Sequence, residues 1–309
     1  MIDCSKKGEI KMPERQFILS CESTVDLPYA YVEGRDIPVL FYTYMIDGAT
    51  FIDDMGRESG SIPAFYRKLE AGALPTTAQI NEVQYEEFLE PLLKKGDVLH
   101  IVFGTGMTSS YQCALLAAEA LRERYPERKL VLIDSLCSSS GYGMLVDDAA
   151  DMRDKEASIE ETAVLAERES HLIHHQFFST DLRYFHRSGR VSGPAAAIAT
   201  VLSICPIMRL DDRGRIIAYD KVRGKKAAIA RTVDTMEKHA VGGRDYAGKC
   251  FVCHSNCPAE AEQTAQALRE RFPKMQPIRI CDIGCIIAAH SGPGTVAAFF
   301  LGDPRAPEK

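Results

Sequence analysis

The sequence predicts an α/β protein of two domains. Residues 15–165 are expected to form an N-terminal α/β/α domain with a parallel sheet, and residues 166–309 a C-terminal α/β domain with a mixed sheet. Residues 1–14 are polar and are expected to be an extension. Three observations support this division: a length of 309 residues, apolar strands joined through helices in the first half, and an antiparallel hairpin signal in the second.

The first elements follow from apolar runs and turn residues. Residues 17–21 are apolar and predict a buried strand, which ends at the turn-forming segment Glu22-Ser-Thr-Val-Asp26. Residues 37–46 and 49–52 flank Asp47-Gly48, a strong hairpin signal. Two helices are expected next, one opened by a capping Ser61 and an early proline, the other by a capping box of Asn81 and Gln84.

A βαβ unit follows. Residues 97–103 and 129–134 are apolar strands, and residues 111–125 between them have alanine and leucine at helical spacing. Strands joined in this way lie parallel in a sheet that is covered on both faces. Ser158 and Glu161 then predict a capping box at the start of a further helix.

The second half has a different pattern. A short strand at residues 176–180 precedes a small-residue helix at 195–202, and residues 204–210 and 215–220 predict antiparallel strands around the turn at 211–214. Helices at 225–239 and 258–272 alternate with strands at 249–254, 276–281 and 296–301. This mixture of connections predicts a mixed sheet.

Composition excludes several classes of function. The net charge of −6 provides no electrostatic footprint for nucleic acid. No apolar run approaches the roughly 20 residues of a transmembrane helix, and the N-terminus lacks the apolar core of a signal peptide. We therefore expect a cytoplasmic protein whose ten cysteines remain thiols.

The loop Gly104-Thr-Gly-Met-Thr-Ser-Ser110 is the first candidate site, because it joins a parallel strand to a helix. Free N–H groups and the helix dipole favour an anion there. Gly104-x-Gly106-x-x-Ser109, with Asp134 after the next strand, also permits a nucleotide-dependent enzyme, although the third glycine of that motif is missing. A helix start capped by hydroxyls explains the same residues without a ligand.

Three further residues are candidates, each with a structural alternative. Thr77 lies in a polar loop and suits a turn as well as a ligand. Arg223 could hold a carboxylate, or could be a surface residue at a helix start. His290 precedes Ser-Gly-Pro-Gly, a segment that suggests close backbone approach, but it could equally be hydrogen-bonded to a neighbouring carbonyl.

The cysteine pairs Cys253/Cys257 and Cys281/Cys285 have a spacing that zinc sites tolerate. Each pair begins at the end of an apolar strand, where cysteine is commonly a small buried hydrophobe. No Gly-x-Ser-x-Gly elbow marks a nucleophilic serine. We therefore expect no metal and no catalytic residue, with a zinc-dependent protein as an alternative.

Taken together, these segments resemble the DegV family. The resemblance lies in an ordered set of motifs that covers about residues 17–301: Cys21-Glu-Ser-Thr-Val-Asp-Leu27, Thr77-Ala-Gln79, Gly106-Met-Thr-Ser-Ser-Tyr-Gln112, Val131-Leu-Ile-Asp-Ser135, Gly189-Arg-Val-Ser192, Cys205-Pro-Ile207, Lys221-Val-Arg-Gly224 and His290-Ser-Gly-Pro-Gly294. Glu22 replaces the family's aspartate, Thr108 replaces a serine and Ser109 replaces a glycine, so one wall of the site is altered.

The resemblance implies a fold shared with the substrate domain of dihydroxyacetone kinase and a long-chain fatty acid bound between the two domains. By motif position, Thr77, Thr108, Arg223 and His290 would hold the carboxylate, and the tail would lie in an apolar tunnel. It further implies a carrier that has no cofactor and is not an enzyme. Such a carrier would present the acid to a fatty acid kinase for phospholipid synthesis.

Overall fold

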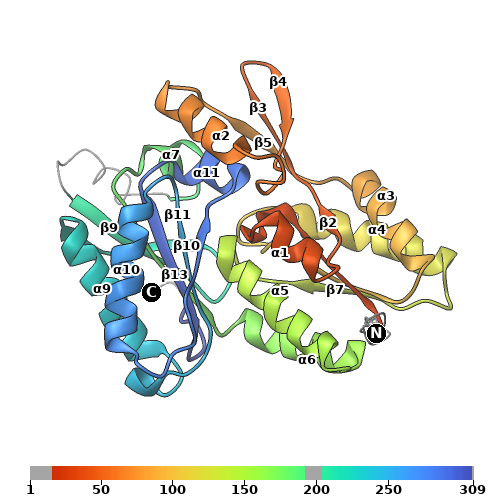
Figure 1. The fold of residues 1–309 in the computed structure, drawn as a ribbon. Helices are drawn as coiled ribbons and strands as arrows, with labels where there is room; N and C mark the ends of the chain where they lie inside the picture. The colour runs from red at the N-terminus through yellow and green to blue at the C-terminus, as the bar shows by residue number, and fades with distance from the viewer. Residues whose placement is uncertain (1–15, 192–203, 308–309) are drawn as a thin grey trace, which may run out of the picture.

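The computed structural model describes residues 16–191 and 204–307. The expected extension at 1–14 and the expected helix at 195–202 lie outside the described residues. Figure 1 shows two sheets side by side with helices around and between them. The chain passes from the first sheet to the second at His171 and Leu172.

The first sheet has the order β2-β1-β6-β7, and all its neighbouring strands are parallel. Its strands are β1 (Ile18–Glu22), β2 (Val39–Leu40), β6 (Val98–Val102) and β7 (Leu130–Asp134). The parallel sheet predicted from the βαβ unit is confirmed, because α4 (Ser110–Arg124) connects β6 to β7. The boundary drawn at residues 165 and 166 falls inside α6 (Ile159–Ser170), which packs on β6 and β7.

Helices surround this sheet: α1 (Tyr29–Gly34), α3 (Glu82–Leu93), α4, α5 (Ser139–Asp154) and α6. The capping boxes predicted at Asn81 and Ser158 are both present and open α3 and α6. A short 3-10 turn, η1 (Ser23–Val25), follows β1 and packs against α5.

A small antiparallel sheet projects above the first domain (Figure 1), with the order β4-β3-β5. β3 (Thr43–Ile46) and β4 (Ala49–Ile52) form the predicted hairpin, with positive φ angles at Asp47 and Gly48 as its turn requires. β5 (Thr76–Ala78) corrects the expected loop, because Thr77 pairs with β3. α2 (Ser61–Glu70) begins at Ser61, whose hydroxyl bonds to Asp54 and does not cap the helix.

The second sheet is mixed, as predicted, with the order β10-β9-β8-β13-β11-β12. Only β11 and β12 are parallel neighbours. The strands are β8 (Ile173–Ser179), β9 (Ile204–Leu210), β10 (Ile216–Arg223), β11 (Cys250–His254), β12 (Arg279–Asp282) and β13 (Thr295–Leu301). α9 (Lys225–His239) and α10 (Pro258–Arg271) cover one face, and the short elements are α7 (Arg183–Arg187), η3 (Gly243–Asp245) and α11 (Cys285–Ser291).

Helix α5 joins the two domains, because it packs on β1 of the first sheet and on β8, β11 and β13 of the second (Figure 1). Its first half is buried on all sides, and two glycines permit the close approach. A Cβ atom at Gly141 would lie 2.4 Å from the His175 ring, and one at Gly143 would lie 2.5 Å from the Val25 carbonyl oxygen. One hydrophobic core therefore runs from the first sheet to the inner face of the second.

Candidate functional site

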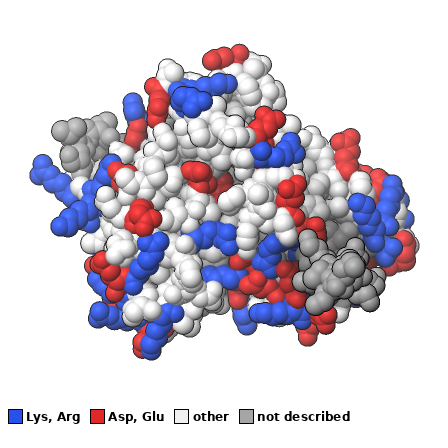
Figure 2. Space-filling model, viewed as in Figure 1, with Lys and Arg blue, Asp and Glu red and all other residues white. Residues whose placement is uncertain are grey.

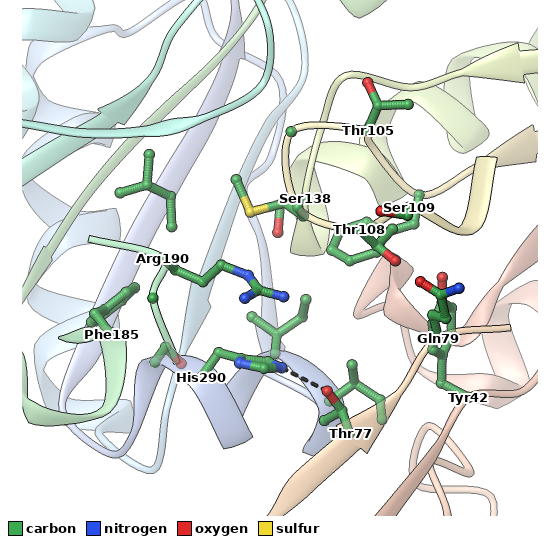
Figure 3. A pocket seen from close by; sticks show the side chains of 18 of the residues that line it. Tyr42, Thr77, Gln79, Thr105, Thr108, Ser109, Ser138, Phe185, Arg190 and His290 are labelled. Atoms are coloured by element: carbon green, nitrogen blue, oxygen red, sulfur yellow. Dashed lines mark hydrogen bonds between the residues drawn. The ribbon is translucent and has the colours of Figure 1, made fainter. Parts of the chain in front are cut away.

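A cavity of about 660 Å³ lies between the domains (Figure 3). Its walls come from the loop before α4, from β5, from the segment after α7 and from α11. The polar side chains that line it are Thr77, Gln79, Thr105, Thr108, Ser109, Ser138, Arg190 and His290. The apolar ones include Phe103, Met107, Phe185, Ile216, Ile286 and Ile287. Three of the four residues predicted as ligands, Thr77, Thr108 and His290, are thus brought together.

The first wall of the cavity carries hydroxyl groups. Thr108 Oγ1 lies 2.9 Å from Ser110 Oγ and accepts the Ser110 backbone N–H at 3.2 Å. Ser110 Oγ in turn lies 3.0 Å from the Tyr42 hydroxyl. Thr108 and Ser109 line the cavity directly before α4, so the positive end of that helix faces it. This wall suits an anion.

A buried carboxylate, Glu22, supports the hydroxyl wall from beneath. Glu22 is fully buried at the end of β1 and accepts hydrogen bonds from the Phe103 N–H at 2.9 Å, from the Tyr42 hydroxyl at 3.2 Å and from the Tyr85 hydroxyl. Phe103 is the last residue before the loop. Glu22, one of the residues that depart from the family motifs, therefore has three hydrogen-bond donors and anchors the start of the loop through Phe103.

The second wall carries an imidazole. His290 lies near the end of α11, and its Nε2 atom is 2.8 Å from Thr77 Oγ1 on β5. Burial, with the positive charges of Arg190 and Arg187, lowers the pKa of His290 to about 4. The imidazole is therefore neutral near pH 7, and it joins a residue of the second domain to one of the first.

Arg190 is the guanidinium that lines the cavity, and the candidate residues chosen from sequence did not include it. It lies in the segment after α7, where burial lowers its pKa, and its Nη1 atom donates to the Ser188 carbonyl at 2.7 Å. Figure 3 shows its side chain extending into the cavity near His290. The motif Gly189-Arg-Val-Ser192 was the sequence signal that could have identified it.

Arg223 is not brought to the cavity. It is the last residue of β10 and is exposed, whereas the cavity is lined by Ile216 at the other end of the same strand. Seven residues of extended chain separate the two by about 23 Å. Among the described residues, Arg190 lines the cavity and Arg223 does not.

Two acidic residues of the first domain hold the N-terminus of α11. Asp26 accepts the Gly284 N–H at 2.9 Å and the Ser139 hydroxyl, and Asp53 accepts the Cys285 N–H at 3.1 Å and the Ser23 hydroxyl at 3.0 Å. Burial raises the pKa of Asp26 well above its usual range and that of Asp53 to about 7. The bonds to Gly284 and Cys285 cross the domain interface and position the helix that carries His290.

The nucleotide interpretation finds no support in the loop. Both carboxylate oxygens of Asp134 are engaged by Thr105, one with its N–H at 3.1 Å and the other with its hydroxyl at 2.6 Å. A Cβ atom at Gly106 would lie 2.2 Å from the backbone of Gly214, in the turn between β9 and β10. Gly106 therefore permits close packing of the two domains, and Asp134 holds the loop by hydrogen bonds to Thr105.

The predicted cysteine pairs do not form a zinc site. Cys253 and Cys281 face each other on β11 and β12, and burial raises the pKa of both. Within the described ranges, no cysteine belongs to a cluster with metal-binding geometry. On the surface, acidic and basic side chains are interspersed over the face that Figure 2 shows. Within residues 16–191 and 204–307, no helix is long and apolar enough to cross a membrane.

The cavity continues into an apolar recess. Ser138, Phe185, Ile216, Ile287 and Ser291 line both the cavity and this narrow extension of about 60 Å³. Deeper in, its lining includes Phe177, Leu210, Ile283, Ala297 and Phe299. The site therefore has a polar mouth and an apolar end.

The fold places the protein in a class of two-domain α/β proteins with solved members. The structure titled "Fatty Acid Binding of a DegV family Protein from Thermus thermophilus" has a TM-score of 0.81 at 24% identity and covers 93% of this chain and 99% of that one. The structure of the fatty acid binding DegV family protein SAG1342 from Streptococcus agalactiae has a TM-score of 0.77 at 25% identity, over 96% and 100% of the two chains.

The sequence comparisons identify the family. A family model described as "Uncharacterised protein, DegV family" matches residues 18–303. The DegV domain-containing protein CPE0026 of Clostridium perfringens is 34% identical over 95% of this chain and 100% of its own length. The chain therefore belongs to the DegV family, which confirms the resemblance inferred from the motifs.

Proposed function

We propose that this protein binds a long-chain fatty acid in the cavity between its domains. The observation that carries the proposal is a single cavity with a polar mouth and an apolar end. The carboxylate would bind Thr77, Thr108, Arg190 and His290, and the tail would extend toward Phe177 and Phe299. A volume of about 660 Å³ is within the usual range of small-molecule sites.

The chemistry of both ends suits this ligand. A buried carboxylate needs partners, since its desolvation otherwise costs several kcal/mol. Arg190 supplies charge, while the threonine hydroxyls and a neutral imidazole supply hydrogen bonds. A tail of sixteen carbons, at about 0.8 kcal/mol for each buried CH₂, contributes roughly 10 kcal/mol before ordering costs. The relatives titled as fatty-acid-binding proteins support the same ligand.

The test is mass spectrometry of lipid extracted from untagged, purified protein, followed by titration of the delipidated protein with palmitate. We expect a retained acid and saturable binding of one acid per chain. A well-folded preparation that neither retains nor takes up any fatty acid would refute the proposal.

The tail path can be tested separately. Ala297 faces the recess, whereas its neighbour Ala298 faces the core beneath α9 and α10. Ala297→Leu should shift the retained acids toward shorter chains, because the new side chain fills the apolar end. Ala298→Leu is the matched control: overpacking costs either variant about 1–3 kcal/mol of stability, but only the first should change the chain length.

We further propose that the protein is a carrier that presents the bound carboxylate to a fatty acid kinase, and that it performs no chemistry itself. A solved structure of the same fold is titled as the Streptococcus pneumoniae Fatty Acid Kinase (Fak) B3 protein loaded with linoleic acid, with a TM-score of 0.80 at 19% identity over 93% and 100% of the chains. Acyl phosphate should form from ATP and bound acid only when a kinase subunit is added. Its formation by this chain alone would refute the carrier proposal.

A further inference from the structure

A second cluster of ligating side chains lies on the outer face of the second sheet. His174 lies on β8, His239 is the last residue of α9, and Asp303 follows β13. None of the three lines the cavity or its recess. His174 Nε2 and His239 Nδ1 each lie 3.0 Å from Asp303 Oδ1.

Backbone hydrogen bonds hold the segments that carry these three residues close together. The Asp303 N–H donates to the His239 carbonyl at 2.9 Å, and the Gly302 N–H donates to the Leu172 carbonyl at 2.9 Å. An isolated β-bridge joins Ala240 to Gly302. The His174 ring is stacked between His239 and Phe300, at centroid distances of 5.2 and 5.1 Å. The cluster is therefore preorganised by elements far apart in the sequence.

We propose that His174, His239 and Asp303 form a binding site for a divalent transition-metal ion of the Zn²⁺ type. Two imidazoles and a carboxylate are ligands that such ions prefer. With metal–ligand bonds of about 2.1 Å, ligand atoms lie about 3.0 Å apart at right angles and about 3.4 Å apart at the tetrahedral angle. The two observed His–Asp separations of 3.0 Å match the right-angle value, and all three ligand atoms lie within 4.8 Å of one another.

The charges at the site suit a dication. Asp303 supplies a carboxylate, and the two imidazoles supply ring nitrogens, which bind a metal in their neutral form. His174 Nε2 also lies 2.8 Å from the Asp303 carbonyl oxygen, so a metal bound at Nε2 would require the ring proton to move from Nε2 to Nδ1. Asp303 is 55% exposed, which leaves an entry path and room for a water ligand.

The acidic cluster of Asp147, Asp148 and Asp151 provides an instructive contrast. Lys249 Nζ lies 2.6 to 2.7 Å from a carboxylate oxygen of each, so an ammonium group already occupies the centre of that cluster. The charged partner at the histidine site is Asp303 itself, with no lysine or arginine bonded to that carboxylate among residues 16–191 and 204–307. The proposal departs from the sequence expectation of no metal. The sequence contains no motif for this site, because His239 and His174 lie 64 and 129 positions from Asp303.

The test uses untagged, chelator-treated protein titrated with Zn²⁺ by calorimetry and with Co²⁺ by visible absorption. We expect one saturable site per chain and a Co²⁺ spectrum with nitrogen ligands. His239→Gln and Asp303→Asn, both at accessible positions, should each weaken Zn²⁺ binding by about tenfold or more, as even second-shell changes do at metal sites. Palmitate binding should be unchanged.

His171→Gln is the matched control, because His171 is exposed, close to His174 in sequence and outside the cluster. Circular dichroism of each variant checks its fold. The proposal is overturned if the wild-type protein shows no saturable Zn²⁺ binding, or if His239→Gln and Asp303→Asn bind Zn²⁺ as the control does. The three residues would then be a hydrogen-bonded cluster only.

Discussion

The two walls of the cavity are built in different ways. The hydroxyl wall, Thr105–Ser110, belongs to the first domain and is held within it, by Glu22 beneath and by Asp134 beside it. The imidazole wall is carried by α11 of the second domain, but the carboxylates that hold the N-terminus of α11, Asp26 and Asp53, come from the first domain.

The two walls therefore depend on different contacts: the hydroxyl wall mainly on contacts within one domain, and the imidazole wall on contacts between the two domains. The side chains of the hydroxyl wall are hydrogen-bonded within the first domain, although Gly106 in the same loop packs against Gly214 of the second. The position of His290 depends on hydrogen bonds across the domain interface, including its own contact with Thr77. A substitution of Glu22, beneath the hydroxyl wall, should therefore lower the free energy of unfolding and also disturb the loop. A substitution of Asp53, which holds the imidazole wall, should show how much the contacts between the domains contribute to stability.

The largest expected effect is at Glu22. Glu22→Ala leaves the Phe103 N–H and the Tyr42 and Tyr85 hydroxyls without their acceptor, so we expect a loss of about 3–5 kcal/mol in the free energy of unfolding. Urea denaturation measures it. Glu22→Gln keeps the side-chain length and should cost less. Equal stability of Glu22→Ala and wild type would show that the buried carboxylate does not support the loop.

Asp53 tests the second wall through pH. Its pKa is about 7 in the folded protein, above the usual 3.8, so the native state keeps a proton that the unfolded chain loses. Stability from this group is therefore present below about pH 4 and is lost as pH rises to 7, by up to about 4 kcal/mol at 1.36 kcal/mol for each pKa unit.

Asp53→Asn should lack this dependence, so the stability of wild type relative to the variant should fall from pH 4 to pH 7. The lowered pKa of His290 acts in the opposite direction, but it is present in both proteins and cancels in the difference. Denaturation curves across this pH range measure the effect. Parallel stability profiles for the two proteins would exclude a raised pKa at Asp53.

The two arginines provide a direct comparison for ligand binding. Arg190→Ala should weaken palmitate binding by about 1.5–3 kcal/mol, because a charge-assisted hydrogen bond is lost. Arg223→Ala is the control and should leave the affinity unchanged, since that side chain is exposed at the far end of β10. Calorimetric titration of both variants decides between them, and the reverse result would return the carboxylate to Arg223.

The smallest expected effect is at Thr108. Thr108→Val preserves shape but removes the hydroxyl that meets Ser110, so we expect palmitate affinity to fall by about 0.5–1.5 kcal/mol. Thr108→Ser retains the hydroxyl and should restore it. Calorimetry measures both, and identical affinities for the valine and serine variants would remove this hydroxyl from the head-group site.

Local signals in the sequence determined much of the fold. The capping boxes at Asn81 and Ser158, the hairpin at Asp47-Gly48 and the parallel βαβ unit all follow from interactions between residues close in the chain. The ordered motifs also identified the family, and they marked Thr77, Thr108 and His290, which the fold brings to one cavity.

Only the tertiary structure decided which charged groups meet. Arg190 and Arg223 both lie in family motifs, and only packing brings Arg190 to the cavity and leaves Arg223 about 23 Å along a strand from it. The contacts of Asp26 and Asp53 with α11 join residues more than two hundred positions apart. Hydrogen bonds and charge interactions depend on distance in space. For groups on separate helices or strands, the number of residues between them in the sequence does not give that distance.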